Sequence, residues 1–261
     1  MPSKLRYLPY PPTSLPVRDL FVLEQVFFTK KTRLMEIGVG CGETSARLAA
    51  ECGQVVGVDI AEKVIGSLEY LKKRFRNLEL VCVDVTNEGK VEQEFDVIVS
   101  CDTLEHVNKP DRFFCFVAEH LKSDGVAHVL FPNEFPSEMH GVTRFESEDD
   151  LRRVISGMFS SVQIYRADLR RWPRLVVTLA FGWKRILCRR ENRKRGEAPQ
   201  CFDNTRFFRN IKLWKRISPL INFYWFVVLG LCRLFGRVYL VKPVRPLDFE
   251  TSCDLYVRLT K

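Results

Sequence analysis

The stretch LMEIGVGCGETSA, residues 34–46, is the most informative part of the chain. An apolar run typical of a β-strand leads into Gly38, Gly40 and Gly42, and a helical pattern begins near Glu43. Glycines suit this position because the chain must turn sharply and let a ligand lie against bare backbone at a helix N-terminus. The dinucleotide-binding pattern G-x-G-x-x-G does not match, because its third glycine would fall at Glu43. The stretch therefore predicts a strand–turn–helix unit with a ligand site of another kind.

The same alternation of strand and helix continues on both sides of this unit. Apolar, β-branched runs predict strands at RLMEIG, VVGVD, LELVCVD, FDVIVSC, VAHVLFP, SVQIYRA and CDLYVRLT. Helical periodicity predicts helices over residues 17–28, 43–52, 62–75, 111–121 and 146–158. We therefore expect an α/β fold with a doubly wound, mostly parallel, seven-stranded sheet. Residues 1–32 are expected to form an N-terminal lead and helix. Residues 33–169 and 246–261 are expected to form the core, and residues 170–245 a helical insertion before the last strand.

Acidic residues stand at the ends of several predicted strands. Glu36 lies inside the strand before the glycines, where a carboxylate would repel a pyrophosphate but suits a ligand carrying an ammonium and a sulfonium. Asp59, Asp84 and Asp102 end or follow the next strands. A single acid at a strand end is more often a solvated turn or a helix cap. Four acids on consecutive strands favour a shared binding site instead.

These residues resemble motif I, E/D-x-G-x-G-x-G, of the class I S-adenosylmethionine-dependent methyltransferases. The LEHV tetrad and the spacing from His140 to Phe145 resemble the small-molecule members of this family, the ubiquinone-type and sugar O-methyltransferases. The resemblance implies a Rossmann-like fold and bound S-adenosylmethionine. It implies that Asp59 accepts hydrogen bonds from both ribose hydroxyls, that Asp84 reads the adenine amino group, and that Val85 offers a backbone N–H to the ring. The expected cofactor-binding residues are Glu36, Gly38, Gly40, Gly42, Asp59, Ile60, Asp84, Val85, Cys101 and Glu105.

Two histidines are candidates for the chemistry, because transfer to a hydroxyl needs a group that removes its proton. His140 lies in a predicted loop after the fifth strand, and its spacing to Phe145 resembles relatives in which such a histidine acts as general base. His106, in LEHV, is expected to shape the methyl side of the pocket. A loop histidine can equally cap a helix or face solvent, and Asp102 and Glu105 remain fallback bases.

The net charge of +9 is unevenly distributed along the chain. Residues 166–245 hold 20 Lys/Arg against 4 Asp/Glu, whereas the rest holds 21 against 28. Within the basic segment, residues 217–232 carry no charge, but a membrane span needs about 20 apolar residues and this run contains Pro219 and Asn222. Apolar, aromatic helices flanked by cations suit a membrane surface instead.

Three interpretations of this segment stay open. Residues 171–241 can form a lid on an anionic membrane surface that presents a lipid-linked or other small-molecule acceptor. They can form a soluble lid, or a nucleic-acid surface, although neither an RNA-binding module nor an N-P-P-Y-type tetrad is present. We predict O-methylation of a lipid-linked glycan or an isoprenoid-like acceptor. An RNA or protein methyltransferase and a non-catalytic scaffold are the alternatives.

The nine cysteines are odd in number and form no C-x-x-C pair, which argues against both a disulfide framework and a zinc site. No cluster of carboxylates and histidines with ligand spacing is seen, so no metal is expected. The N-terminal residues lack the apolar run of a signal peptide. We expect a cytoplasmic protein, peripheral on the cytoplasmic face of a membrane. An apolar content of 46% and a charged content of 28% exclude a wholly disordered chain.

Overall fold

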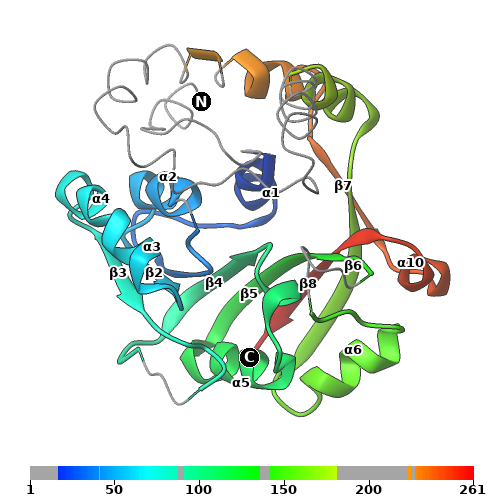
Figure 1. The fold of residues 1–261 in the computed structure, drawn as a ribbon, viewed down its shortest axis with the longest axis horizontal. Helices are drawn as coiled ribbons and strands as arrows, with labels where there is room; N and C mark the ends of the chain where they lie inside the picture. Colours follow the sequence, from blue (N-terminus) through cyan, green and yellow to red (C-terminus); the bar gives the residue numbers. More distant parts are fainter. Residues whose placement is uncertain (1–16, 41, 88–90, 136–141, 181–222, 225–226) are drawn as a thin grey trace, which may run out of the picture. The chain divides into compact units, whose positions relative to one another are not determined.

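The computed structural model describes residues 17–40, 42–87, 91–135, 142–180, 223–224 and 227–261. Over these residues the strands form one eight-stranded sheet in the order β3-β2-β1-β4-β5-β8-β6-β7 (Figure 1). The strands are β1 (Arg33–Ile37), β2 (Gln54–Asp59), β3 (Leu78–Cys82), β4 (Phe95–Cys101), β5 (Leu121–Asn133), β6 (Ser161–Leu169), β7 (Tyr239–Pro243) and β8 (Cys253–Thr260).

Helices connect most of these strands. They are α1 (Val17–Gln25), α2 (Glu43–Glu51), α3 (Glu62–Ser67), α4 (Glu69–Arg74), α5 (Pro110–His120), α6 (Glu148–Ile155), α10 (Pro246–Glu250) and the short 3-10 helix η2 (Leu104–His106). Residues 171–180 and 227–232 are also helical.

The sheet is mostly parallel and has its topological switch point between β1 and β4. β1 pairs in parallel with both β2 and β4, so the chain first builds outward through β2 and β3 and then crosses to the other side of β1. β8 runs antiparallel between β5 and β6. In open α/β sheets, ligands bind beyond the carboxyl ends of the strands at such a switch point.

The predicted fold class is confirmed. Among the details, α1 and α6 are shorter than predicted, α10 was not predicted, and two further differences concern the sheet and the third predicted helix. The sheet has one strand more than expected, because β7 forms within the segment that was predicted to be helical. The helix predicted over residues 62–75 is divided at Leu68, where the backbone leaves helical geometry with φ −97° and ψ 0°. Leu68 itself is fully buried at this break.

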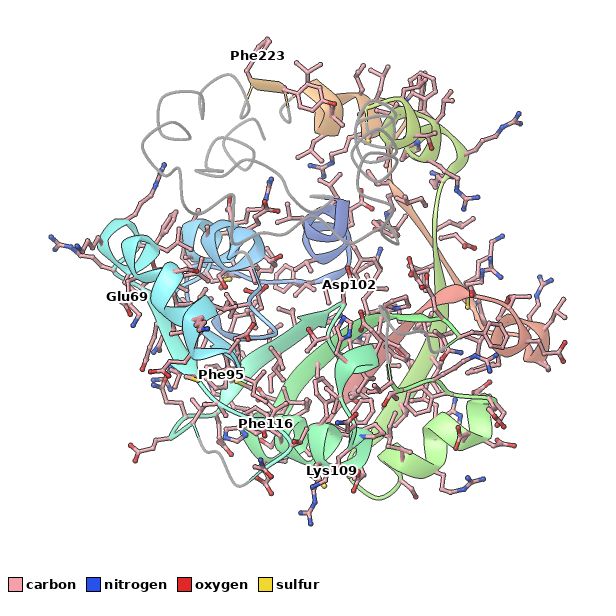
Figure 2. The ribbon with its side chains drawn as sticks, viewed as in Figure 1. Glu69, Phe95, Asp102, Lys109, Phe116 and Phe223 are labelled. Atoms are coloured by element: carbon pink, nitrogen blue, oxygen red, sulfur yellow. The ribbon has the colours of Figure 1, made fainter. Side chains whose placement is uncertain are left out.

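One face of the sheet and two helices enclose the main core. Phe113, Phe114 and Val117 of α5 and Leu151 and Ile155 of α6 are buried in this cluster. β1, β2 and β8 contribute every second residue to it, as a pleated sheet with alternating side chains requires. Phe95 and Phe116 of the same cluster are labelled in Figure 2. Packing in this core therefore fixes the position of the strands whose ends carry the candidate site.

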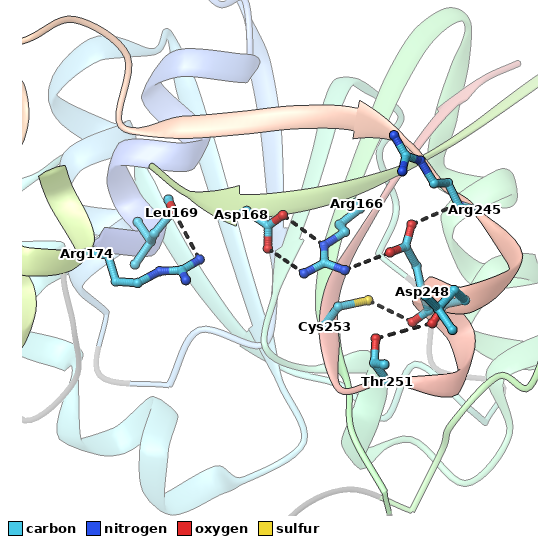
Figure 3. Close-up of polar contacts among 9 residues, drawn as sticks. Arg166, Asp168, Leu169, Arg174, Arg245, Asp248, Thr251 and Cys253 are labelled. Atoms are coloured by element: carbon cyan, nitrogen blue, oxygen red, sulfur yellow. Dashed lines mark hydrogen bonds and ion pairs between the residues drawn. The ribbon is translucent and has the colours of Figure 1, made fainter. Parts of the chain in front are cut away.

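The chain divides into two compact units, of which unit 2 comprises residues 25–168 and 241–261. Within unit 2, ion pairs join the end of β6 to α10 (Figure 3). The Arg166 guanidinium contacts Asp168 through two hydrogen bonds of 2.8 and 3.1 Å and Asp248 through one of 2.7 Å. Burial raises the pKa of Asp248, but hydrogen bonds from Arg166 and from the Arg245 N–H outweigh it and hold that pKa below its ordinary value. We call these residues the arginine clasp.

Unit 1 comprises residues 1–24 and 169–240. Two of its described helical segments run antiparallel, since the Trp172 indole donates to the Leu231 carbonyl at 2.8 Å and the Tyr224 hydroxyl donates to the Ala180 carbonyl at 2.8 Å. The Glu24 carboxylate accepts the backbone N–H groups at the start of β7. In the part of the chain that the structure describes, no helix is both long and apolar enough to cross a bilayer.

Candidate functional site

A cavity of about 400 Å³ lies in unit 2 at the carboxyl ends of four parallel strands, β1 to β4. Its volume falls within the usual range for small-molecule sites, about 300–1,000 Å³. The residues that line it follow the strand ends in turn: Ile37, Gly38, Gly40, Val58, Asp59, Ile60, Val83, Asp84, Val85, Thr86, Asp102, Thr103, His106, Val107 and Asn108. The cavity thus lies at the switch point between β1 and β4.

The glycine loop after β1 forms one wall of this cavity. Gly38 has φ +83°, and a Cβ atom at this position would lie 1.9 Å from the Thr103 hydroxyl oxygen. Gly40 has φ +50°, and a Cβ atom there would meet no atom within 4 Å. Gly38 therefore allows close packing against the end of β4, whereas Gly40 leaves bare backbone beside open space. This arrangement suits a ligand that lies directly against the main chain.

Asp59, the last residue of β2, is held by the backbone around it. Its Oδ2 accepts the Gly40 N–H at 3.1 Å and its Oδ1 accepts the Ala61 N–H at 2.9 Å. A carboxylate has about four acceptor positions, so each oxygen keeps one for a ligand. The next residue, Ile60, is 67% exposed and lines the cavity as an apolar side chain. The end of β2 therefore offers a fixed pair of acceptors beside an apolar surface.

Asp84, two residues beyond β3, is held by side chains of the following turn. Its Oδ1 accepts the Thr86 hydroxyl at 2.7 Å and the Thr86 N–H at 2.9 Å, and its Oδ2 accepts the Asn87 side-chain amide at 2.6 Å. The hydrogen bonds from Thr86 are the main cause of a lowered pKa at Asp84. The carboxylate is therefore ionised at neutral pH. Val85 lies beside it in the cavity wall.

The turn after β4 closes the far side of the cavity. Asp102 has φ +52°, and it is the one residue other than glycine with positive φ in the described chain. The Thr103 hydroxyl lies 3.2 Å from the carbonyl oxygens of both Ile37 and Cys101, so it joins the ends of β1 and β4. Backbone strain of this kind persists where surrounding contacts enforce it, and it occurs often at functional sites.

His106 lines the cavity, and its side chain is 58% exposed. Its Nε2 lies 3.8 Å from Oε1 of the buried Glu105, which is too far for a hydrogen bond. The Glu105 carbonyl accepts N–H groups from Val142 at 2.6 Å and Thr143 at 3.1 Å. These two bonds attach the chain that follows residues 136–141 to η2. His140 is one of residues 136–141 and lies outside the described residues.

Seven of the predicted site residues line the cavity: Gly38, Gly40, Asp59, Ile60, Asp84, Val85 and His106. The other four that the structure describes do not. Glu36 is buried and accepts the Ser45 hydroxyl of α2, and Gly42 begins α2 with φ +73°. Cys101 ends β4, and Glu105 lies behind His106. Asp102, which was predicted to share the acidic site and to be a fallback base, lines the cavity, whereas Thr103 and Asn108 line it without having been predicted. The Asp-Thr pair directly after an apolar strand was the available signal.

The two remaining histidines are buried and hydrogen-bonded elsewhere. Nδ1 of His120 lies 2.8 Å from the Phe116 carbonyl, and its Nε2 accepts the Val91 N–H at 3.2 Å. Nδ1 of His128 lies 2.7 Å from the Tyr256 hydroxyl, and burial lowers the pKa of His128 to about 3. Among the described residues, His106 is therefore the histidine that faces the cavity.

Metal and disulfide chemistry have no visible basis in the described chain. No group of three or more His, Cys, Asp or Glu side chains there is arranged to hold a metal ion. The six cysteines whose state the structure gives form no disulfide: Cys52, Cys82, Cys101, Cys115, Cys232 and Cys253. The side chains of Asp59 and Asp84 line the cavity, and their oxygens suit a ligand with positive charge or hydroxyl groups.

Comparison with known sequences agrees with this geometry. Residues 35–129 match the family model described as a methyltransferase domain. The ubiquinone biosynthesis O-methyltransferase of Coxiella burnetii is 32% identical over 111 residues, which are 42% of this chain and 47% of that protein. The malonyl-[acyl-carrier protein] O-methyltransferase of Acetivibrio thermocellus is 30% identical over 126 residues, 46% of this chain and 43% of that protein. The chain thus spans about half the length of these curated relatives.

Solved structures share the fold at low sequence identity. Phosphoethanolamine N-methyltransferase 2 of Haemonchus contortus, in complex with S-adenosylhomocysteine, gives a TM-score of 0.56 at 17% identity and covers 94% of this chain and 52% of its own. The [4+2]-cyclase SpnF gives 0.54 at 13% identity and covers 94% and 80%. Residues 35–129 thus match a methyltransferase domain, and the likeness to these solved structures shows that the chain shares their fold.

Proposed function

We propose that this protein transfers the methyl group of S-adenosylmethionine to a hydroxyl of a lipid-linked glycan or an isoprenoid-like acceptor. The observation that carries the proposal is the cavity at the switch point, where the bare backbone of Gly40 and the carboxylates of Asp59 and Asp84 face one space. Carboxylates suit a cofactor that carries an ammonium and a sulfonium. When bound, this cofactor supplies an activated methyl group.

The residues of the cavity fit the parts of this cofactor. Asp59 would accept the ribose hydroxyls through the acceptor positions that Gly40 and Ala61 leave open. Asp84, kept ionised by Thr86, would accept from the adenine amino group, and Val85 and Ile60 would cover the ring with apolar surface. The methionine end would then lie toward Asp102 and the turn after β4.

A histidine at the Asp102 end would receive the proton of the acceptor hydroxyl. His106 lines the cavity, and Val142, two residues after His140, is bonded to the backbone of the neighbouring Glu105. We assign the role of proton acceptor to His140. His106 would shape the part of the cavity that holds the methyl group. A positioned base contributes roughly 10²- to 10⁴-fold to the rate. His140→Asn should therefore lose turnover by about that factor with cofactor affinity unchanged, whereas His106→Gln should retain most of it. The reverse result would make His106 the base.

The acceptor class is supported by composition and by the names of the relatives. Two of them are O-methyltransferases, and one of these serves ubiquinone biosynthesis. Residues 166–245 combine a large excess of Lys and Arg with uncharged, aromatic-rich runs. An acceptor held in a membrane would bring its hydroxyl to a protein bound at the cytoplasmic face through residues 171–241. An RNA acceptor fits the arginines but not the long uncharged run.

The experiment has two independent readouts. Calorimetry with S-adenosylmethionine and S-adenosylhomocysteine should show binding, and Asp59→Asn should weaken it. The full chain is then incubated with methyl-labelled S-adenosylmethionine and a bacterial lipid extract, total RNA or a protein extract. Label in the lipid fraction supports the proposal. Label in RNA or protein would replace the acceptor class, and cofactor binding without any labelled product would favour the scaffold interpretation.

A further inference from the structure

The described helices of unit 1 carry apolar side chains on two faces instead of one. In the helical residues 171–180, Val176 and Val177 are buried, as an amphipathic helix requires. Leu175 and Leu179 of the same helix, however, are 49% and 71% exposed. Burial within the fold accounts for the first pair only, so the second pair needs another explanation.

The partner helix and the turn that follows it repeat this pattern. Val228, Leu229 and Cys232 are buried. Other apolar residues of this helix and its flanking residues are exposed, with exposed fractions from 40% to 67%: Phe223, Val227, Leu231, Leu234 and Phe235. Phe223 is labelled in Figure 2, where its ring points away from the ribbon. We call Leu175, Leu179 and these five residues the apolar surface of unit 1.

Contacts between the two helices hold this surface together. The Trp172 indole donates to the Leu231 carbonyl at 2.8 Å, and its ring meets that of Phe235 edge-to-face at 5.1 Å. At the other end, the Tyr224 hydroxyl donates to the Ala180 carbonyl at 2.8 Å. The exposed leucines and phenylalanines therefore belong to a defined helix pair. Exposed apolar side chains in such a group mark an interaction surface.

Charge identifies the partner of this surface. The side chains described in unit 1 include five arginines, at positions 170, 171, 174, 233 and 237. Among the side chains described in unit 1, Glu24 is the one acid, and its carboxylate already accepts the N–H groups of Val238 and Tyr239. The described side chains of unit 1 thus combine exposed apolar groups with an excess of positive charge. A second copy of the chain would bring the same arginines together across a two-fold axis, which like charges oppose.

We propose that the apolar surface of unit 1 and its arginines bind the interfacial layer of an anionic lipid bilayer without crossing it. The leucines and phenylalanines would enter the boundary of the acyl chains, and the arginines would meet the anionic head groups. This inference deepens the proposed function, because the bilayer would be the source of the acceptor. The role of the bilayer as that source rests on the proposed function. Lipid binding itself requires no catalysis.

The experiment measures flotation of the full chain with vesicles of phosphatidylcholine containing about 30 mol% phosphatidylglycerol, a composition that gives a negative surface. The variant Leu179→Asn/Phe223→Asn/Leu234→Asn changes exposed side chains of the apolar surface. We expect its partition coefficient to fall at least tenfold. The control Phe27→Asn/Leu247→Asn removes side chains that are 85% and 64% exposed in unit 2. It should stay within about twofold of the unchanged protein.

The charge component has its own variant. Arg171→Gln/Arg237→Gln should weaken flotation several-fold at low salt, and added salt should weaken the unchanged protein in the same way. Calorimetry with S-adenosylmethionine on each preparation reports whether unit 2 is intact. Cofactor binding without flotation would overturn the lipid surface and leave the methyltransferase proposal standing. Flotation that the apolar variant does not alter would overturn the interfacial mode. Salt-sensitive binding of total RNA without flotation would replace the bilayer by nucleic acid.

Discussion

Two groups of aspartates at the carboxyl edge of the same sheet have opposite surroundings. Asp59 and Asp84 accept hydrogen bonds from backbone N–H groups, a hydroxyl and an amide, and they face a cavity. Asp168 and Asp248 contact the Arg166 guanidinium of the arginine clasp (Figure 3). Neutral donors orient a carboxylate without cancelling its charge, whereas a guanidinium cancels it. The first group therefore remains available to a ligand, and the second group stabilises the fold.

The largest expected effect is at Gly38, in the cavity wall where the ends of β1 and β4 meet. Gly38→Ala places a Cβ atom 1.9 Å from the Thr103 hydroxyl oxygen at φ +83°. We expect cofactor affinity to fall more than 100-fold and the free energy of unfolding to fall by about 3 kcal/mol, from strain and overpacking together. Calorimetry and urea unfolding measure the two quantities.

Gly157→Ala is the matched control for this change. Gly157 has φ +79°, but a Cβ atom there would meet nothing within 4 Å. The substitution should cost about 1 kcal/mol of stability through the backbone alone and leave cofactor affinity unchanged. Equal losses of affinity in both variants would show that the contact with Thr103 is irrelevant to the site.

The next largest effect comes from replacing one aspartate of each group by asparagine. Asp59→Asn should weaken cofactor binding roughly 10- to 150-fold, since a charge-assisted hydrogen bond contributes about 1.5–3 kcal/mol. It should lower the free energy of unfolding by only about 1 kcal/mol, because the amide nitrogen cannot accept one of the two N–H groups, of Gly40 and Ala61. Asp248→Asn should leave binding unchanged but lower the free energy of unfolding by about 2 kcal/mol, because it weakens a contact with Arg166, whose side chain is only about one third exposed. Loss of binding in Asp248→Asn with an intact fold would remove the distinction between the two groups.

A smaller effect is expected at Thr103, which joins β1 to β4. Thr103→Val keeps the shape but loses the hydroxyl, so the turn that carries Asp102 and His106 should be less well positioned. We expect turnover to fall about tenfold with cofactor affinity within about twofold. Thr103→Ser restores the hydroxyl and should recover most of the rate. If serine and valine gave the same rate, the hydroxyl would have no positioning role.

The smallest effect is the pH dependence of the arginine clasp. The pKa of Asp248 is lowered in the folded protein, so its contribution to stability is complete above the unfolded pKa of about 3.9. That contribution should be lost as pH falls through the folded pKa. The difference in unfolding free energy between the unchanged protein and Asp248→Asn should therefore be constant from about pH 7 to 5 and shrink below about pH 4. A difference that grows on acidification would contradict the clasp.

The strand ends of the site were predictable because they depend on local patterns. Apolar runs followed by Gly38, Asp59 and Asp84 predicted which residues follow β1, β2 and β3. Parallel strands bring their carboxyl ends to one edge, so the shared location followed as well. The positive φ of Asp102 and the contact of Thr103 with Ile37 were not predictable, since they arise between strands distant in sequence. The edge strand β7 was not predicted either, because it pairs with β6, which is distant from it in sequence.

The sequence by itself determined the parallel α/β fold, the glycine loop and the separation of an acidic core from a basic segment, because periodicity, turn chemistry and charge are local properties. The tertiary structure decided which acids face the cavity and which neutralise Arg166. It also decided that Glu36 lies buried against Ser45 and that leucines and phenylalanines of unit 1 remain exposed. These outcomes depend on which side chains meet across the fold, and the packing of distant strands and helices sets those meetings.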